Sequence, residues 1–293
     1  MKCTLCPRKC NVDRTEKTGY CKMPEDIYVA RAALHMWEEP CISGENGSGT
    51  VFFSGCTLRC VFCQNREIAA GRAGKKINVN RLADIFMELQ EKGAHNINLV
   101  TPTHYSVQIA EALKMAKVNG LNIPVVYNTS GYENVDNIKE LDGLVDIFLP
   151  DFKYVSSEYS AKYSNAPDYF EVAKEALAQM YRQTGKPQFD ENGMMLKGII
   201  VRHLILPGLT KDSKNVIKYL YETYGDNIYI SIMNQYTPLP YVQKYPEINR
   251  RITAEEYDSV VDYAIDIGVE NGFIQEDGTA QESFIPEFNY EGV

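Results

Sequence analysis

The sequence has no cysteine after Cys63, although its 293 residues include eight of them. They form an N-terminal group of four, a central triplet and one residue left over: Cys3, Cys6, Cys10 and Cys21; Cys56, Cys60 and Cys63; and Cys41. This distribution argues against a metal cluster in the C-terminal half of the chain.

Basic charge and long apolar runs are also scarce. The formal net charge is −9, whereas a nucleic-acid-binding surface usually carries an excess of basic residues. No apolar run approaches the length of a membrane span, and no apolar segment near the N-terminus precedes a cleavage site. We therefore expect a cytoplasmic protein with neither nucleic acid nor membrane as a partner. In that reducing compartment, cysteines serve as metal ligands more often than as disulfides.

The central triplet has the spacing C-x3-C-x2-C and directly follows an apolar run at residues 50–53. Iron–sulfur clusters are normally held by four cysteines. Three thiolates from one loop suit a cube-shaped cluster whose fourth iron stays open to another ligand. Zinc sites use paired short arms around a tetrahedron, which this triplet fits poorly. The triplet therefore predicts an iron–sulfur cluster that binds something at its open iron.

The N-terminal cysteines have the spacing C-x2-C-x3-C-x10-C. Four thiols so close together can form a closed metal site, which would staple a segment too short to bury a core. A structural zinc site, an accessory iron–sulfur cluster for electron delivery and four free thiols are the alternatives. We rank structural zinc ahead of a redox cluster.

Alternating strand and helix patterns predict the fold. Short apolar runs occur at residues 51–54, 97–100, 124–127, 146–149, 198–206 and 228–233. Helical periodicity occurs at residues 80–92, 106–118, 135–144, 170–183 and 214–224. This alternation indicates βαβ units with a parallel sheet. Six strands are too few for a closed eight-stranded barrel, so we expect an α/β fold with an open partial (β/α)6 TIM-like barrel, whose chemistry lies at the C-terminal strand ends.

The flanking regions predict two additions to the barrel. Residues 1–48 form a Cys-rich N-terminal extension, in which residues 28–37 are expected to pack as a strand across the barrel mouth, with His35 and Trp37 as packing residues. Residues 49–240 form the barrel. Residues 241–293 form a helix at 253–268 and an irregular tail, packed on the barrel. Residues 272–288 are interpreted as a lid or, with more weight, as a surface tail.

Polar groups follow each predicted strand. They include amides, a carboxylate and basic side chains, a mixture that a zwitterionic amino-acid ligand would need. The segments are Thr101-Pro-Thr-His-Tyr105, Asn128-Thr-Ser-Gly131, Asp151-Phe-Lys153, Arg202-His203 and Asn234-Gln-Tyr-Thr-Pro238.

The triplet, with aromatic Phe62 before its last cysteine, resembles the radical S-adenosylmethionine (SAM) superfamily. Further motifs resemble the pyruvate formate-lyase activating-enzyme branch: Gly-Ser-Gly-Thr-Val-Phe-Phe-Ser-Gly-Cys56, Asn128-Thr-Ser-Gly-Tyr, Asp151-Phe-Lys and Val201-Arg-His-Leu-Ile-Leu-Pro-Gly. The four-cysteine start and the tail at residues 280–289 resemble an uncharacterised activase-like subgroup. The resemblance covers roughly residues 47–238.

The resemblance implies a [4Fe-4S] cluster at the triplet, whose open iron binds SAM and which cleaves SAM reductively to a 5′-deoxyadenosyl radical. It also implies a cofactor-binding set. Asp151 and Lys153 would line the methionine and ribose end, Arg202 would face the SAM carboxylate, and Phe62 would lie against the adenine. Each charged residue has an alternative as an ordinary ion pair at the barrel mouth. The remaining candidates for cofactor binding are Thr103, His104, Asn128, Thr129 and Tyr236.

Three departures from the family pattern bear on these roles. The Gly-Gly-Glu type turn that holds the SAM amino group is replaced by residues 101–104, so Thr103 or a nearby carbonyl would substitute. His104 is either a SAM or substrate contact or a surface residue. Activases often have Asp in place of Asn128, where it helps to bind a monovalent cation, and His in place of Tyr236.

Three functions remain open on this reading. The favoured one is installation of a glycyl radical on a partner enzyme, with electrons from a donor such as flavodoxin or ferredoxin. The second keeps the radical chemistry but acts on a small molecule or peptide. The third is a non-enzymatic iron–sulfur or zinc scaffold or sensor.

Overall fold

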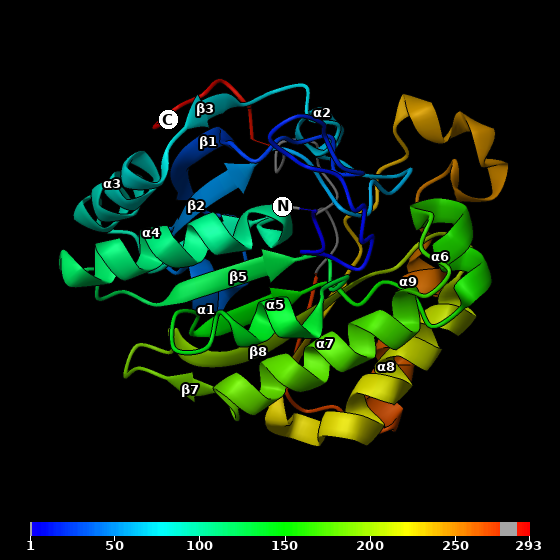
Figure 1. The fold of residues 1–293 in the computed structure, drawn as a ribbon. Coiled ribbons are helices and arrows are strands. Elements are labelled where there is room, and N and C mark those ends of the chain that lie inside the picture. Colours follow the sequence, from blue (N-terminus) through cyan, green and yellow to red (C-terminus); the bar gives the residue numbers. More distant parts are fainter. Residues whose placement is uncertain (1, 276–285) are drawn as a thin grey trace.

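The computed structural model describes residues 2–275 and 286–293, in which ten strands form one open sheet (Figure 1). The strand order is β10-β9-β8-β6-β5-β4-β2-β1-β3, and β7 pairs with β8 outside this path. The strands are β1 Ile27–His35, β2 Ser48–Phe53, β3 Lys75–Ile77, β4 Ile97–Val100, β5 Val125–Thr129, β6 Ile147–Pro150, β7 Gln188–Phe189, β8 Met195–Leu204, β9 Tyr229–Met233 and β10 Gly272–Ile274.

Helices follow most of the parallel strands. They are α1 Pro40–Ser43, α2 Arg66–Ala69, α3 Val79–Glu91, α4 Ser106–Val118, α5 Val135–Lys139, α6 Ser157–Ser164, α7 Tyr169–Thr184, α8 Thr210–Tyr224 and α9 Ala254–Asp266, with short 3-10 turns at Thr103–Tyr105, Gly225–Asn227, Pro240–Lys244 and Pro246–Ile248. The predicted helix at 135–144 is shorter because the chain turns at Gly143, whose φ is +71°. The predicted start of α9 is confirmed, since Thr253 and Glu256 form a capping box.

The six predicted barrel strands are confirmed and run parallel as β2, β4, β5, β6, β8 and β9. The sheet is not closed, as expected for a partial barrel. One further parallel strand, β10, comes from the region interpreted as a lid or tail and pairs with β9. Its three residues carry too little pattern to mark a strand in the sequence.

The strand predicted to cross the barrel mouth lies elsewhere. β1 pairs antiparallel with β2 from Val29 to His35 and also with β3, so it extends the sheet instead. Such pairing satisfies the backbone N–H and C=O groups of β2, which would otherwise form an edge. Although β1 lies within residues 1–48, it belongs to the same sheet as the barrel strands.

Alternating side chains divide the sheet into an outer and an inner face. Val125 and Tyr127 of β5 belong to the main core, which contains the apolar faces of the covering helices such as α3, α4 and α7 (Figure 1). Val126 points the other way, into a smaller cluster with Ile147 and Ile200. Since side chains alternate with a period of two, the next inward positions are Asn128 on β5 and Arg202 on β8, while β6 carries Leu149 before Asp151. The barrel interior is therefore apolar below and polar at the C-terminal strand ends.

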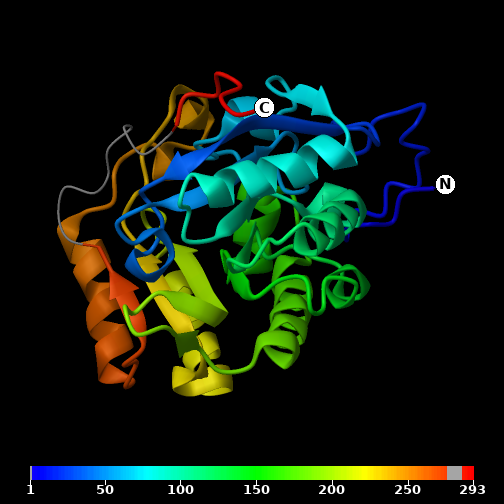
Figure 2. The same cartoon turned by 90° about the vertical axis from the view of Figure 1, so that its left-hand side faces the viewer.

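The two ends of the chain lie at different parts of this frame (Figure 2). The N-terminal segment packs on the loop of the central triplet. Residues 286–293 run beside β1, where the backbone N–H of Tyr290 donates to Ala30 and that of Ala32 to Glu291. The ring of Phe288 packs on Phe52 with 5.5 Å between centroids. Most of the predicted lid or tail, residues 276–285, lies outside the described residues.

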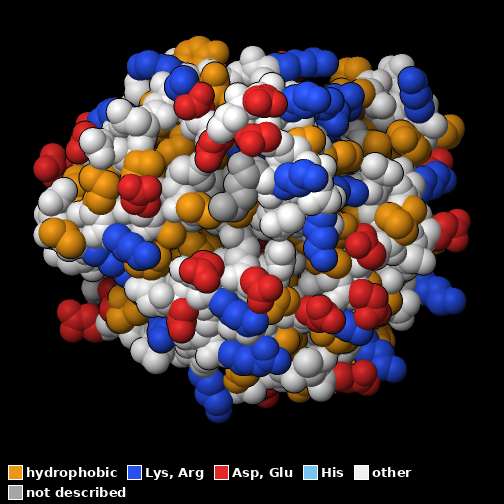
Figure 3. All heavy atoms as spheres, viewed as in Figure 1, with side chains coloured by type: hydrophobic (Ala, Val, Ile, Leu, Met, Phe, Trp, Pro, Cys, Tyr) orange, Lys and Arg blue, Asp and Glu red, His pale blue; other side chains and the backbone are white. Residues whose placement is uncertain are grey.

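Lys and Arg side chains are interspersed with Asp and Glu on the face seen in Figure 3. The negative charge of the chain is therefore not gathered into one patch on that face. Among the described residues, no helix has the length and apolar character needed to cross a membrane.

Candidate active site

The three cysteines of the triplet line one side of a cavity of about 260 Å³ at the C-terminal ends of the strands. They lie in the loop between β2 and α2, which turns through a left-handed Arg59 with φ +58°. Two backbone N–H groups, of Leu58 and Arg59, point at the Sγ of Cys56 at 3.4 and 3.5 Å. These contacts orient a sulfur ligand toward the cavity.

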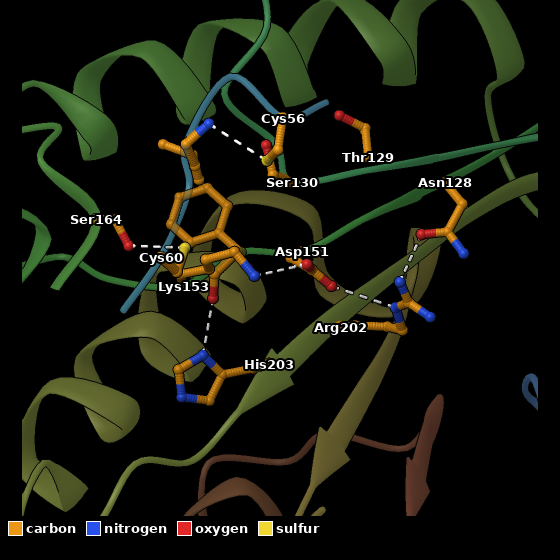
Figure 4. Close-up of polar contacts among 12 residues, drawn as sticks. Cys56, Cys60, Asn128, Thr129, Ser130, Asp151, Lys153, Ser164, Arg202 and His203 are labelled. Carbon is orange, nitrogen blue, oxygen red and sulfur yellow. Dashed lines mark hydrogen bonds and ion pairs between the residues drawn. The ribbon is translucent and has the colours of Figure 1, made fainter. Parts of the chain in front are cut away.

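The thiol of Cys60 receives a hydrogen bond from outside the loop. Ser164 at the end of α6 donates its hydroxyl to Cys60 Sγ at 2.9 Å (Figure 4). Burial raises the pKa of Cys60, while the Lys153 ammonium lowers it. Burial, together with the neighbouring Cys56 and Cys60, raises the pKa of Cys63 to about 12. Because the thiolate is the metal ligand, binding of iron must release these protons.

Opposite the cysteines lies a network of charged side chains from β6 and β8 (Figure 4). Asp151 accepts from Lys153 Nζ at 2.6 Å and from Arg202 Nε at 3.3 Å. Arg202 also donates through Nη2 to Asn128 Oδ1 at 2.6 Å. Burial acts to raise the pKa of Asp151, but Lys153 and then Arg202 outweigh it, so the pKa is lowered and the carboxylate stays charged.

Glu38 completes this network and was not found by sequence reasoning. Its Oε2 accepts from Arg202 Nη1 at 3.0 Å, and its Oε1 accepts from Asn98 Nδ2 at 2.9 Å. The Glu38 side chain is only 7% exposed, and burial raises its pKa although Arg202 opposes this. A pair of glutamates directly after an apolar strand was the available signal. The network thus contains two carboxylates and two cationic side chains. Arg202 already has three partners in it, Asp151, Glu38 and Asn128, before it could bind the carboxylate of a ligand.

The predicted aromatic and hydroxyl residues fall into two groups. Phe62 and Thr129 line the cavity together with Asn128. Tyr236 lies behind them, because its ring contacts Phe62 at 6.2 Å and its hydroxyl donates to the Ile248 carbonyl at 2.7 Å. Tyr236 therefore supports Phe62 and does not line the cavity.

Thr103 and His104 do not line the cavity either, contrary to the prediction that they bind the cofactor. Thr103 donates its hydroxyl to Glu133 at 2.6 Å, and His104 Nε2 lies 2.6 Å from the Ser54 carbonyl beneath the triplet loop. Both are buried, so the alternative of a surface histidine is also wrong. The short 3-10 turn that follows β4 points them away from the cavity. Thr101, left-handed at φ +59°, lies at the cavity in their place.

Sequence reasoning also missed several other cavity-lining residues. Trp37, expected to be a packing residue, is 57% exposed. Residues such as these are hard to recognise because their roles arise from segments that meet only in the fold. They are His35, Trp37, Gln64 and Pro286. Ser130 and Gln235 also line the cavity and belong to two of the strand-end segments singled out in the sequence.

None of the four N-terminal cysteines lines this cavity. Among residues 2–275 and 286–293, no three His, Cys, Asp or Glu side chains are grouped so that they could hold a metal ion. Thiolates around a cube-shaped cluster stand further apart than those around a single ion. A cluster is therefore judged by its donor set, and three thiols on one loop facing a cavity fit the three protein ligands of a [4Fe-4S] cluster with an open iron.

The fold and the site thus define a class of α/β proteins in which three cysteines at the mouth of an open barrel are placed to bind a metal centre. Residues 50–220 match the radical SAM superfamily model, and the chain belongs to the radical SAM superfamily. Membership implies a [4Fe-4S] cluster and SAM, and supports reductive SAM cleavage as its chemistry.

Two curated relatives are similar to the chain. One is an uncharacterised protein of Methanocaldococcus jannaschii, 31% identical over 89% of this chain and 74% of its own length. The other is the pyruvate formate-lyase-activating enzyme of Clostridium pasteurianum, 25% identical over 71% of this chain and 82% of its own length.

Solved structures share the fold at low identity. SuiB of Streptococcus suis bound to its precursor peptide SuiA has a TM-score of 0.50 and 14% identity, covering 76% of this chain and 47% of SuiB. SuiB bound to S-adenosylmethionine has a TM-score of 0.50 and 13% identity, over 76% of this chain and 49% of SuiB. The chain thus spans about half the length of these structures, and the likeness concerns the fold alone.

Proposed function

We propose that the chain activates a glycyl radical enzyme by abstracting a hydrogen atom from it. The motifs at residues 128–132, 151–153 and 201–208 and the similarity to the Clostridium pasteurianum activating enzyme support this role. The observation that carries it is the network of Asp151, Lys153 and Arg202 beside the triplet.

The cluster, when bound, would supply an electron that breaks a carbon–sulfur bond of SAM and leaves a 5′-deoxyadenosyl radical. The residues of the chain would bind and orient SAM. Cys56, Cys60 and Cys63 would hold the cluster. Asp151 would accept from the ribose hydroxyls or the amino group, while Lys153, tied to Asp151 at 2.6 Å, would place a positive charge between the carboxylate and Cys60.

The apolar part of the cavity would hold the adenine and exclude water. Phe62, braced by Tyr236, offers a ring face at the cavity wall. Thr129, whose hydroxyl donates to Glu133, would present its backbone to the ligand. Asn128 is a neutral amide and supplies no charge for the monovalent cation that family activases bind near this position, and its Oδ1 already accepts from Arg202.

Reduction of the cluster requires a one-electron donor, for which a flavodoxin or ferredoxin is proposed. The experiment combines the anaerobically reconstituted, reduced protein with SAM and candidate glycyl radical enzymes. A glycyl radical signal in the electron paramagnetic resonance spectrum of the partner is expected. Formation of 5′-deoxyadenosine without this signal for any candidate would reject the activating role.

A second candidate is radical chemistry on a small molecule or peptide. It is favoured by the departures from the activase pattern at residues 101–104, Asn128 and Tyr236. Analysis of turnover mixtures by mass spectrometry would decide between them, since this candidate predicts a modified small product and no radical on a protein glycine.

A further inference from the structure

Two of the four N-terminal thiols lie against one glycine. A Cβ atom added at Gly19 would lie 3.4 Å from Cys10 Sγ and 3.7 Å from Cys21 Sγ. Backbone hydrogen bonds from Cys3 to Val12, and from Asn11 back to Cys3, fold the start of the segment onto itself at 2.8 and 3.0 Å. The segment is thus folded so that a side chain at position 19 would crowd two of the sulfurs.

The backbone brings Cys3 and Cys6 toward the same pair. The N–H of Lys9 donates to the Cys6 carbonyl at 3.0 Å, which turns the chain between Cys6 and Cys10. Cys3 pairs through its backbone with Asn11 and Val12, which directly follow Cys10. The four cysteines therefore lie in one tightly folded segment.

The backbone around these cysteines resembles that of the triplet loop. Tyr20 donates its N–H to Cys10 Sγ at 3.2 Å, as Leu58 and Arg59 do to Cys56. Left-handed residues adjoin the cysteines in both places. They are Lys9, Asn11 and Lys22 in the N-terminal segment and Arg59 in the triplet loop. Hydrogen bonds to the sulfurs are among the features by which proteins hold and tune iron–sulfur clusters.

The spacings of the two groups are mirror images. The triplet reads C-x3-C-x2-C, and the N-terminal segment reads C-x2-C-x3-C followed by a fourth cysteine after ten intervening residues. The N-terminal set therefore contains a comparable three-thiol loop and also the fourth ligand that the triplet lacks. A four-cysteine zinc site usually has two short arms, and here the second arm is long. An iron–sulfur cluster therefore fits these four cysteines better than the structural zinc site favoured by their spacing alone.

We propose that Cys3, Cys6, Cys10 and Cys21 hold a second, fully ligated iron–sulfur cluster. Its loop packs on the loop of the triplet: the Cys21 carbonyl and Met23 lie against Gly55, where a Cβ would come 2.8 Å from the carbonyl oxygen. Arg8 Nε donates to the Thr57 carbonyl at 2.8 Å, and Tyr20 OH to the Leu58 carbonyl at 3.4 Å. The second cluster would thus stabilise the N-terminal segment that packs against the triplet loop.

The test uses the full chain with the triplet removed, as the C56A/C60A/C63A variant. Reconstitution under anaerobic conditions with iron, sulfide and zinc all present is followed by counting of the three elements per chain. The variant is expected to retain iron and sulfide in equal amounts, at about half the iron of the wild type. Loss of all iron, or one bound zinc without sulfide, would overturn the proposal. Because the variant cannot cleave SAM, the result is independent of the proposed function.

A second variant distinguishes a loss of iron caused by the site from a loss caused by misfolding. Gly19→Val in the same background requires no left-handed φ, since Gly19 lies outside that region, and adds methyl groups against the sulfurs of Cys10 and Cys21. We expect its iron content to fall at least twofold, with circular dichroism unchanged. The matched control, Cys41→Ala, removes the leftover buried thiol and should leave the iron content unchanged. Equal iron in both variants would contradict the site.

Discussion

The two cysteine regions differ in what surrounds the sulfurs. The triplet faces a cavity with two carboxylates and two cations on its far wall, so a ligand at an open iron would meet charged partners. The N-terminal group faces no part of that cavity and has a fourth thiol. The comparison shows that the group with three thiols lies beside charged side chains, whereas the group with four thiols lies away from that charged cavity wall. A site for chemistry leaves one position open beside charged groups, whereas a closed site needs only sulfur.

The largest effect should come from removing one sulfur of the triplet, and the comparison is the removal of one sulfur from the N-terminal group. Cys60→Ala is expected to abolish SAM cleavage, because two thiols cannot hold the cluster with its open iron. Cys10→Ala should keep the absorption of the triplet cluster, since the two groups have separate ligands. Visible absorption and 5′-deoxyadenosine release are the measurements. Equal loss of the triplet absorption in both variants would show that the cysteines do not divide in this way.

A smaller effect is expected at Glu133, which lies between the two regions. Its carboxylate accepts from Thr103 and Thr129, and the neighbouring Asn134 donates to the Thr4 carbonyl at 3.3 Å. Burial raises the pKa of Glu133 to about 7 from its ordinary 4.5, although both threonines lower it. The protonated form is therefore favoured by folding.

This group stabilises the fold fully below about pH 4.5, and that stability is lost as the pH rises through about 7. Glu133→Gln should remove roughly 3 kcal/mol of this pH dependence. Chemical unfolding of both proteins between pH 5 and about 8 measures it. Glu140→Gln, on an exposed neighbour, should leave the wild-type slope unchanged. A slope that survives in Glu133→Gln would contradict the assignment.

A still smaller effect is expected where the two regions are joined. Arg8 donates to the Thr57 carbonyl at 2.8 Å and to the Ser164 carbonyl at 3.2 Å, and it stacks on Tyr20. Arg8→Ala should lower the free energy of unfolding by about 2 kcal/mol, since hydrogen bonds to charged groups are lost.

The matched control for Arg8 is Arg72→Ala, which removes an exposed pair with Glu67. Its effect should stay below about 0.5 kcal/mol, because surface ion pairs contribute little. Urea denaturation measures both variants. A loss at Arg8 no larger than at Arg72 would show that the two regions are not joined through this side chain.

Much of the fold could be predicted because hydrophobic periodicity is a local property. All six barrel strands and the start of α9 were predicted in this way. The pairing of β1 and β10 was not, because it depends on which sheet edges remain free after folding. For the same reason the strand predicted to cross the barrel mouth lies within the sheet, between β2 and β3.

The candidate site was predictable where chemistry resides in spacing or in a strand end. Cys56, Asp151 and Arg202 were singled out in the sequence and line one cavity, while their roles there stay predictions. Glu38 was missed because it reaches Arg202 from a distant part of the chain. Thr103 and His104 were misplaced because the turn after β4 buries them, and no sequence pattern reports the direction of a turn.

The central claim is that the cavity beside the triplet cleaves SAM. The most direct measurement is the amount of 5′-deoxyadenosine that the anaerobically reconstituted, reduced protein releases from SAM. Our account predicts release that requires reductant and the intact triplet, and that falls strongly in Asp151→Asn, whose side chain no longer carries the charge that Lys153 and Arg202 face. Absence of 5′-deoxyadenosine from a reduced protein whose triplet carries its full iron would contradict it.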